Sequence, residues 1–328
     1  MDSIPANQSP KISIIMPAYN TAGLIGGCLQ SVFAQTYQDF EAIVVNDGSP
    51  DTLELEKALQ PYIDRIVYIK QPNKRAAGAR NTAIRKARGE FLAFLDSDDE
   101  WLPEHLSSQM KLLRDDSTLS MVYANALLAG DPSGNRKFMD KCPSTGAATF
   151  DALIVERCQV SVSTVVVRKD AIVRAGLFDE SLLRCDDYDM WLRTAFYGAK
   201  IGYSRNVQAR LNEGRPGSLG LSRAKMAEAY WTILEKADQS LALSDADRHL
   251  IRRRAQEIRS LYLLEEGKCR LQERQFDKAR QLFAEANQHF RQPSVGLAVA
   301  GLRVAPNVTG KLISLWDRIR RSSTTEKR

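Results

Sequence analysis

The chain has 328 residues, 44% of them hydrophobic, so we expect a globular protein of two domains, or of one large domain with an appendage. The formal net charge is +6, and residues 291–328, with eight basic and two acidic side chains, account for all of it. A basic excess confined to one tail excludes a nucleic-acid-binding signature for the whole protein.

The first ten residues are polar and lack the apolar run of a secretory signal, and no later stretch is long enough to span a membrane. Five scattered cysteines without a C-x-x-C pair argue against a disulfide framework and against a zinc site. Three histidines in the whole chain argue against a multi-histidine metal site. We therefore expect a cytoplasmic protein with a flexible N-terminus over residues 1–10.

Short β-branched runs alternate with helical patterns in the first hundred residues. Strands are predicted at Ile12–Met16, where Pro17 stops the run, and at Phe40–Val45, Arg65–Ile69 and Phe91–Leu95. Strands that alternate with helices at this spacing indicate βαβ units with right-handed crossovers. The fold class is therefore α/β, a doubly wound and mostly parallel sheet flanked by helices.

The pattern changes twice in the remainder of the chain. Further strands are predicted at Met121–Ala124 and Ser163–Arg168, and an amphipathic helix at Tyr188–Tyr197. A glycine- and proline-rich loop at 214–218 is followed by an almost wholly helix-forming region. We expect a first domain over residues 11–220, a helical region over 221–290 and a basic amphipathic tail over 291–328.

The helical region contains one pair of helices, 262–273 and 276–290, that resembles a tetratricopeptide hairpin. Because one such unit cannot bury its own apolar face, we expect it to pack on the first domain rather than to form a repeat array. The tail combines basic residues with Leu312, Leu315 and Trp316, a pattern typical of a membrane-surface segment. A last helix docked on the body with a frayed basic end is the equal alternative.

The strand at Phe91–Leu95 is followed directly by residues 96–99 (DSDD), which contain the three carboxylates Asp96, Asp98 and Asp99. Open α/β sheets bind ligands at the carboxyl ends of their strands. Like charges this close need a counter-charge, and a divalent metal carrying a phosphate ester supplies one. A solvated turn that caps the next helix is the alternative.

Five motifs occur in order along the first domain: residues 16–20 (MPAYN), 45–49 (VNDGS), 79–81 (ARN), 89–99 (GEFLAFLDSDD) and 186–193 (DDYDMWLR). Together they resemble the signature series of glycosyltransferase family 2, whose members are inverting, metal-dependent enzymes with the Rossmann-like GT-A fold. The resemblance covers residues 11–220. Five motifs in the right order are far more specific than any one of them.

The resemblance implies a nucleotide-sugar site at the sheet edge. Pro17 and Tyr19 would lie beside the nucleobase, with the flat ring of Tyr19 available for stacking, and Asp47 would accept a hydrogen bond from uracil N3–H. Arg80 would meet phosphate or base. The structural alternatives are an aromatic side chain packed on the sheet edge, a turn at Asp47, and a solvated helix arginine.

The resemblance also assigns the acidic residues. Asp96 and Asp98 would lie near the metal, ribose and diphosphate, with Asp98 the best candidate for a ligand of Mn²⁺ or Mg²⁺ and Asp96 or Asp99 the second. Arg215, which stands where many relatives have histidine, would bind the diphosphate or belong to a tight turn.

The resemblance implies one general base opposite the leaving group. Asp187 is our candidate, and an N-cap carboxylate just before the following helix is its structural alternative. The family commonly has glutamate where Asp186 stands. The sequence therefore leaves open whether Asp186 or Asp187 is the base.

These motifs predict transfer of a sugar from a nucleotide-sugar to an acceptor hydroxyl with inversion. UDP-sugar is the expected donor class, with GDP- and dTDP-sugars open. The expected acceptor is a saccharide or lipid-linked saccharide of a cell-surface polymer, which suggests an enzyme peripheral on the inner face of the cytoplasmic membrane. The alternatives are a nucleotidyltransferase and a helical-repeat interaction protein with a non-catalytic GT-A domain.

Overall fold

The structure is a computed structural model that describes residues 9–129, 135–212, 222–313 and 315. The chain divides into two compact units, Met1–Ser218 and Leu219–Arg328. Three predicted features lie outside the described residues: most of the N-terminal segment, the loop that contains Arg215, and Trp316 with the residues after it.

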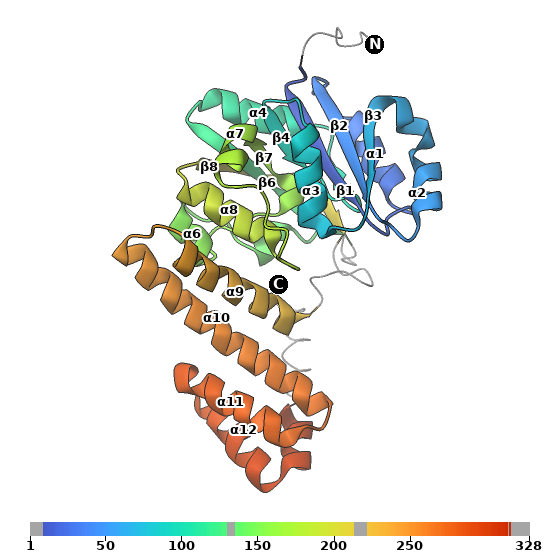
Figure 1. The fold of residues 1–328 in the computed structure, drawn as a ribbon. Helices are drawn as coiled ribbons and strands as arrows, with labels where there is room; N and C mark the ends of the chain where they lie inside the picture. Colours follow the sequence, from blue (N-terminus) through green and yellow to red (C-terminus); the bar gives the residue numbers. More distant parts are fainter. Residues whose placement is uncertain (1–8, 130–134, 213–221, 314, 316–328) are drawn as a thin grey trace. The chain divides into compact units, whose positions relative to one another are not determined.

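The first unit is built on one eight-stranded sheet with the strand order β3-β2-β1-β4-β7-β6-β8-β5 (Figure 1). Strands β3, β2, β1 and β4 are all parallel, whereas β7 is antiparallel to both of its neighbours. The predicted α/β fold with a mostly parallel sheet is confirmed. The strands are β1 Ile12–Ala18, β2 Phe40–Asp47, β3 Ile66–Gln71, β4 Phe91–Phe94, β5 Glu100–Trp101, β6 Leu119–Ala129, β7 Val166–Arg168 and β8 Lys200–Asn212.

Helices flank this sheet, and the core lies between them and the strands. Strands β1 and β4 are buried almost throughout because they are central, which explains their unbroken apolar runs. The helices are α1 Ile25–Phe33, α2 Thr52–Leu59, α3 Arg75–Lys86, α4 His105–Asp115, α5 Phe138–Lys141, α6 Phe150–Ile154, α7 Lys169–Arg174 and α8 Asp186–Phe196, with 3₁₀ turns at Gln60–Arg65 and Val162–Thr164.

Several predicted boundaries were wrong, among them the end of β1 and the start of β7. Strand β1 does not stop at Pro17 but continues to Ala18, with Pro17 in register with Val45 of β2. The missing N–H of proline is tolerated there because the ladder between β1 and β4 ends earlier, at Ile15. The strand predicted at Ser163–Arg168 begins as a 3₁₀ turn, and its extended part is β7 alone.

The second unit consists of helices: α9 Arg223–Ser240, α10 Asp245–Gln272, α11 Phe276–Phe290 and α12 Pro293–Val304, followed by helical backbone at 306–313. Its core joins Leu271, Ala279, Phe283 and Leu302. Gly267 of α10 is opposite Phe283 of α11, and a Cβ at position 267 would lie 2.6 Å from the ring. In the described part of the chain, no helix is both long and apolar enough to cross a membrane.

Candidate functional site

Three parallel strands end at the same edge of the sheet, and hydrogen bonds tie the loops that follow them. The backbone N–H of Asn20 donates to Ser49 Oγ at 2.7 Å, which joins the loop after β1 to the loop after β2. Thr21 Oγ1 and Ser97 Oγ lie 2.9 Å apart, which joins the loop after β1 to the loop after β4. The loops after β1, β2 and β4 are therefore connected, and they bring Tyr19, Asp47 at the end of β2, and Asp96 to the same edge of the sheet.

Tyr19 and Asp47 differ sharply in exposure. Tyr19 is 49% exposed, so its ring is accessible to a ligand, whereas Asp47 is only 2% exposed. Asp47 Oδ1 accepts hydrogen bonds from Gln71 Nε2 at 2.6 Å and from the backbone N–H of Lys74 at 2.8 Å. Its other oxygen accepts no hydrogen bond from the described residues. A carboxylate oxygen at the ligand edge that no group of the described residues uses is suited to accept a hydrogen bond from a bound molecule.

Arg80 lies at the centre of the site and is only 4% exposed, which excludes the solvated-arginine alternative. Its Nη1 donates to Asp186 Oδ2 and its Nη2 to Asp96 Oδ1, both at 2.6 Å. Burial opposes the charge of Arg80, but Asp96 and Asp186 together hold the pKa of the guanidinium above its usual value. One arginine from α3 thus joins the acidic loop after β4 to the first residue of α8.

Asp187 lies in the first turn of α8, one residue inside the helix, and the N-cap is Cys185 in a left-handed conformation (φ 56°). The N-cap alternative for Asp187 was therefore wrong. The backbone N–H of Tyr188 donates to Asp187 Oδ1 at 2.9 Å. Burial and the neighbouring Asp186 raise the pKa of Asp187 to about 6, although Arg80 opposes this shift. A carboxyl whose pKa lies closer to neutrality is a better proton acceptor.

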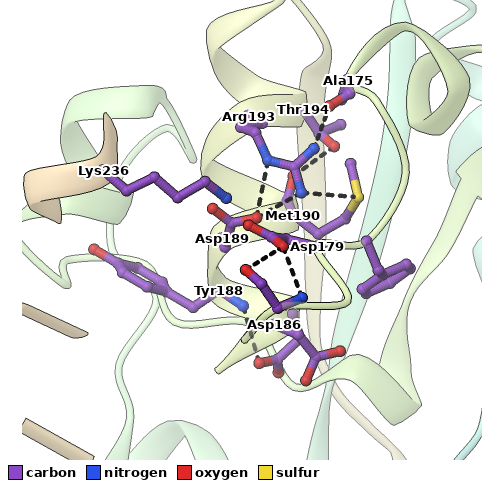
Figure 2. A network of polar contacts seen from close by, with 12 residues as sticks. Ala175, Asp179, Asp186, Tyr188, Asp189, Met190, Arg193, Thr194 and Lys236 are labelled. Carbon is purple, nitrogen blue, oxygen red and sulfur yellow. Dashed lines mark hydrogen bonds and ion pairs between the residues drawn. The ribbon is translucent and has the colours of Figure 1, made fainter. Parts of the chain in front are cut away.

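The rest of α8 is held firmly behind this first turn. Figure 2 shows Arg193 folded back onto Asp189, with its Nε 2.9 Å from Asp189 Oδ2, and donating to the carbonyl oxygen of Ala175. Trp191 is 1% exposed and packs edge-on against Phe94 of β4. These contacts fix the orientation in which α8 presents Asp186 and Asp187.

The acids after β4 have different environments. Asp99 is 8% exposed, and its two oxygens accept hydrogen bonds from Ser163 Oγ at 2.5 Å and from the backbone N–H of Asn212 at 2.8 Å. Burial, with Asp96 and Asp98 nearby, raises the pKa of Asp99 to about 8. The Asp96 side chain is 33% exposed.

The acidic residues after β4 supply only part of the ligands that a divalent metal needs. Among the described residues, no three histidine, cysteine, aspartate or glutamate side chains gather as a complete metal site. Asp96 and Asp98 nevertheless offer hard oxygen donors at a partly exposed position. Mg²⁺ is commonly held by one or two carboxylates, with substrate phosphates and water completing its shell, so these residues fit an ion that binds together with a phosphate-bearing substrate.

Sequence reasoning missed several residues that shape the site. Ser163 orders the acidic loop, because its Oγ donates to Asp99 and also accepts from the backbone N–H of Asp96 at 3.2 Å. Gln71 orients Asp47. Both contacts join residues far apart in the sequence and have no local pattern. Asp186, by contrast, was already a candidate from the sequence, because it directly precedes Asp187.

The chain resembles known proteins in sequence and in fold. Residues 13–142 match the family described as Glycosyl transferase family 2. The Escherichia coli UDP-Glc:alpha-D-GlcNAc-diphosphoundecaprenol beta-1,3-glucosyltransferase WfgD is 33% identical over 182 residues, which are 55% of this chain and 68% of WfgD.

Two solved structures share the fold. The mannosyltransferase PcManGT from Pyrobaculum calidifontis, in complex with GDP-Man and Mn²⁺, has a TM-score of 0.62 and 19% identity over 95% of this chain and 88% of its own. S. aureus TarS 1-349, in complex with UDP, has a TM-score of 0.56 and 21% identity over 77% of this chain and 71% of its own. The match to WfgD favours transfer chemistry over the nucleotidyltransferase alternative. The chain belongs to glycosyl transferase family 2, and it is a glycosyltransferase with the GT-A fold.

Proposed function

We propose that this enzyme transfers a hexosyl residue from a UDP-sugar to an acceptor hydroxyl with inversion at the anomeric carbon. The observation that carries the proposal is the buried bridge of Arg80 to Asp96 and Asp186. This bridge joins the acidic loop after β4, which is suited to the leaving diphosphate, to the helical turn that carries Asp187. An inverting transferase needs a group that stabilises the leaving diphosphate and a base, placed on opposite sides of one anomeric carbon.

The donor nucleotide would occupy the edge formed by the loops after β1 and β2. Tyr19 offers its exposed ring for stacking on the base, and Asp47 offers its second oxygen to the uracil N3–H. The names of similar proteins support this donor class, since WfgD is named for UDP-Glc and TarS was crystallised with UDP. Pro17 is the second-last residue of β1 and lies two positions before Tyr19.

Asp187 would act as the base. As the acceptor oxygen attacks the anomeric carbon, its proton passes to Asp187, and the bond from that carbon to the diphosphate oxygen breaks on the opposite face. The bonding electrons leave with the nucleoside diphosphate, so the anomeric configuration inverts. The raised pKa of Asp187 favours this proton transfer.

Asp96 and Asp98 would hold a divalent cation, Mn²⁺ or Mg²⁺. When bound, the ion supplies positive charge to the leaving diphosphate. We assign Asp99 to the support of the loop rather than to the ion, because Ser163 and Asn212 already use both of its oxygens. Arg215, outside the described residues, stays a sequence-based candidate for the diphosphate.

The acceptor is proposed from the relatives' names alone. WfgD is named for a sugar linked to diphosphoundecaprenol, and the Rhizobium meliloti succinoglycan biosynthesis protein ExoW is 44% identical over 101 aligned residues, which cover 29% of this chain. We propose a lipid-linked saccharide acceptor, a role in cell-surface polysaccharide assembly, and a place at the inner face of the cytoplasmic membrane.

Calorimetry with UDP, GDP and dTDP, each with and without Mn²⁺, tests the donor class. We expect UDP to bind tightest and Mn²⁺ to strengthen its binding. Proton NMR of the first product then tests the stereochemistry. A preference for GDP would contradict the donor class, and a product that retains the donor's anomeric configuration would contradict the single-base mechanism.

A further inference from the structure

The last described helices have an apolar face that the core of their unit does not use. In α12, Leu302 is buried, whereas Leu297 and Val304 are 74% and 85% exposed. In the segment at 306–313, Ile313 packs toward the core, whereas Val308 and Leu312 are 60% and 59% exposed. The two exposed residues of α12 are seven positions apart, and those of the segment at 306–313 are four positions apart. Each pair therefore lies on one face of its helix, so each segment has one exposed apolar stripe.

These stripes are accompanied by positive charge that the unit does not neutralise. Residues 291–313 contain Arg291, Arg303 and Lys311, all exposed, and no aspartate or glutamate. Within the described residues, none of the three cations pairs with a carboxylate. Arg303 directly precedes Val304, and Lys311 directly precedes Leu312.

Two acids of the neighbouring helices illustrate that carboxylates of this unit are paired with other cations. Glu266 of α10 bonds Arg270 within its own helix, and Glu285 of α11 bonds Arg259 at 2.8 Å. Among the described residues, Arg303 and Lys311 therefore form no ion pair with an acid of their own unit. The sequence from residue 316 onward adds five more basic residues against two acidic ones.

We infer that the basic apolar surface formed by Leu297, Arg303, Val304, Val308, Lys311 and Leu312 docks on an anionic lipid bilayer. Apolar side chains of this kind enter the interfacial region of a bilayer, while lysine and arginine meet the phosphate headgroups. The whole net charge of +6 lies in residues 291–328, and the rest of the chain has no net charge. An anionic surface would therefore attract this part of the chain in particular. The inference extends the proposed membrane location but rests on charge and exposure, not on the transfer chemistry.

Co-sedimentation of the full chain with vesicles tests the inference. We expect binding to phosphatidylglycerol–phosphatidylethanolamine vesicles, little binding to phosphatidylcholine vesicles, and release by salt. The double variant Arg303→Gln/Lys311→Gln should weaken binding about 30-fold. The double variant Val304→Gln/Leu312→Gln should weaken it about tenfold or more.

Matched controls come from exposed residues of the first unit. Lys57→Gln/Lys86→Gln removes the same charge, and Leu53→Gln/Val173→Gln removes comparable exposed apolar surface. Both should bind vesicles like the wild type. Thermal melting of all four variants verifies that each is folded.

Wild-type binding by both surface variants would overturn the inference, as would absence of binding to anionic vesicles. Self-association that the Val304→Gln/Leu312→Gln variant abolishes would also overturn it, because the surface would then join copies of the chain. Failure of this inference can be distinguished from failure of the proposed function by measuring UDP binding in the absence of vesicles. The surface variants should bind UDP like the wild type, because the substituted residues lie outside the nucleotide site.

Discussion

Arg80 Nη1 and Asp186 Oδ2 lie 2.6 Å apart, although the two residues are separated by 106 positions in the sequence. The same guanidinium bonds Asp96, so one buried cation holds two carboxylates that come from different parts of the first unit. A buried ion pair broken on one side leaves an uncompensated charge, which is far more costly than loss of an exposed pair. Arg80 is therefore expected to matter for both stability and turnover.

Replacing Arg80 with methionine should lower the free energy of unfolding by about 3–5 kcal/mol and the transfer rate by about 100-fold. Arg80→Lys keeps the charge but loses the fork that reaches both acids, so its loss should be intermediate. Urea denaturation and initial-rate assays measure the two effects. Arg85→Met, on the same helix with a side chain that is 58% exposed, is the control and should change little. Equal behaviour of the two methionine variants would refute the bridging role.

The rate of transfer should depend on the ionisation of Asp187. Because a base must be unprotonated, and because the pKa of Asp187 is raised to about 6, the rate should fall as the pH drops through about 6. An ordinary aspartate would instead lose activity near pH 4. Arg80 lowers this pKa, so Arg80→Met should move the acid limb to higher pH, and Arg80→Lys should leave it nearly unchanged. An acid limb near pH 4 in the wild type would contradict the assignment.

Asp47→Asn should weaken UDP binding selectively. An asparagine can still accept from Gln71 and Lys74 through its oxygen, but its NH₂ would then replace the oxygen offered to the uracil N3–H. Loss of a charge-assisted hydrogen bond of about 1.5–3 kcal/mol predicts a decrease in affinity of roughly 10- to 100-fold. Calorimetry measures it, with Asp39→Asn, an exposed residue just before β2, as the control. Unchanged UDP affinity in the Asp47 variant would remove Asp47 from the base site.

Gly267→Ala should destabilise the second unit by about 1–3 kcal/mol, because the new methyl group would lie 2.6 Å from the ring of Phe283. Adding Phe283→Leu should recover part of this loss, since the smaller side chain makes room. Gly296→Ala in α12, where the nearest atom is 3.6 Å away, is the control and should be neutral or slightly stabilising. Chemical denaturation measures all three variants. Strictly additive losses for the pair would contradict a direct clash.

The central strands could be predicted because β1, β2 and β4 are buried and therefore apolar in sequence. The end of β1 was misjudged because tolerance of Pro17 depends on where the neighbouring strand stops pairing. The start of α8 was misjudged because Cys185 adopts a left-handed conformation that nothing in its side chain signals. The contacts of Arg80 with Asp96 and Asp186 could not be predicted, because they depend on the packing of distant elements and not on local periodicity.

The Asp187→Asn variant tests whether Asp187 is the base that takes the proton of the acceptor hydroxyl. Asparagine preserves the shape of the side chain but accepts no proton, so transfer should fall by at least about 1,000-fold while UDP affinity stays within a factor of about three. Its melting temperature at neutral pH should not fall, because burial disfavours the ionised form that the substitution removes. Asp170→Asn, an exposed residue of α7, is the control for the substitution itself. Near-normal transfer by Asp187→Asn, or a loss explained wholly by weaker UDP binding, would contradict the account.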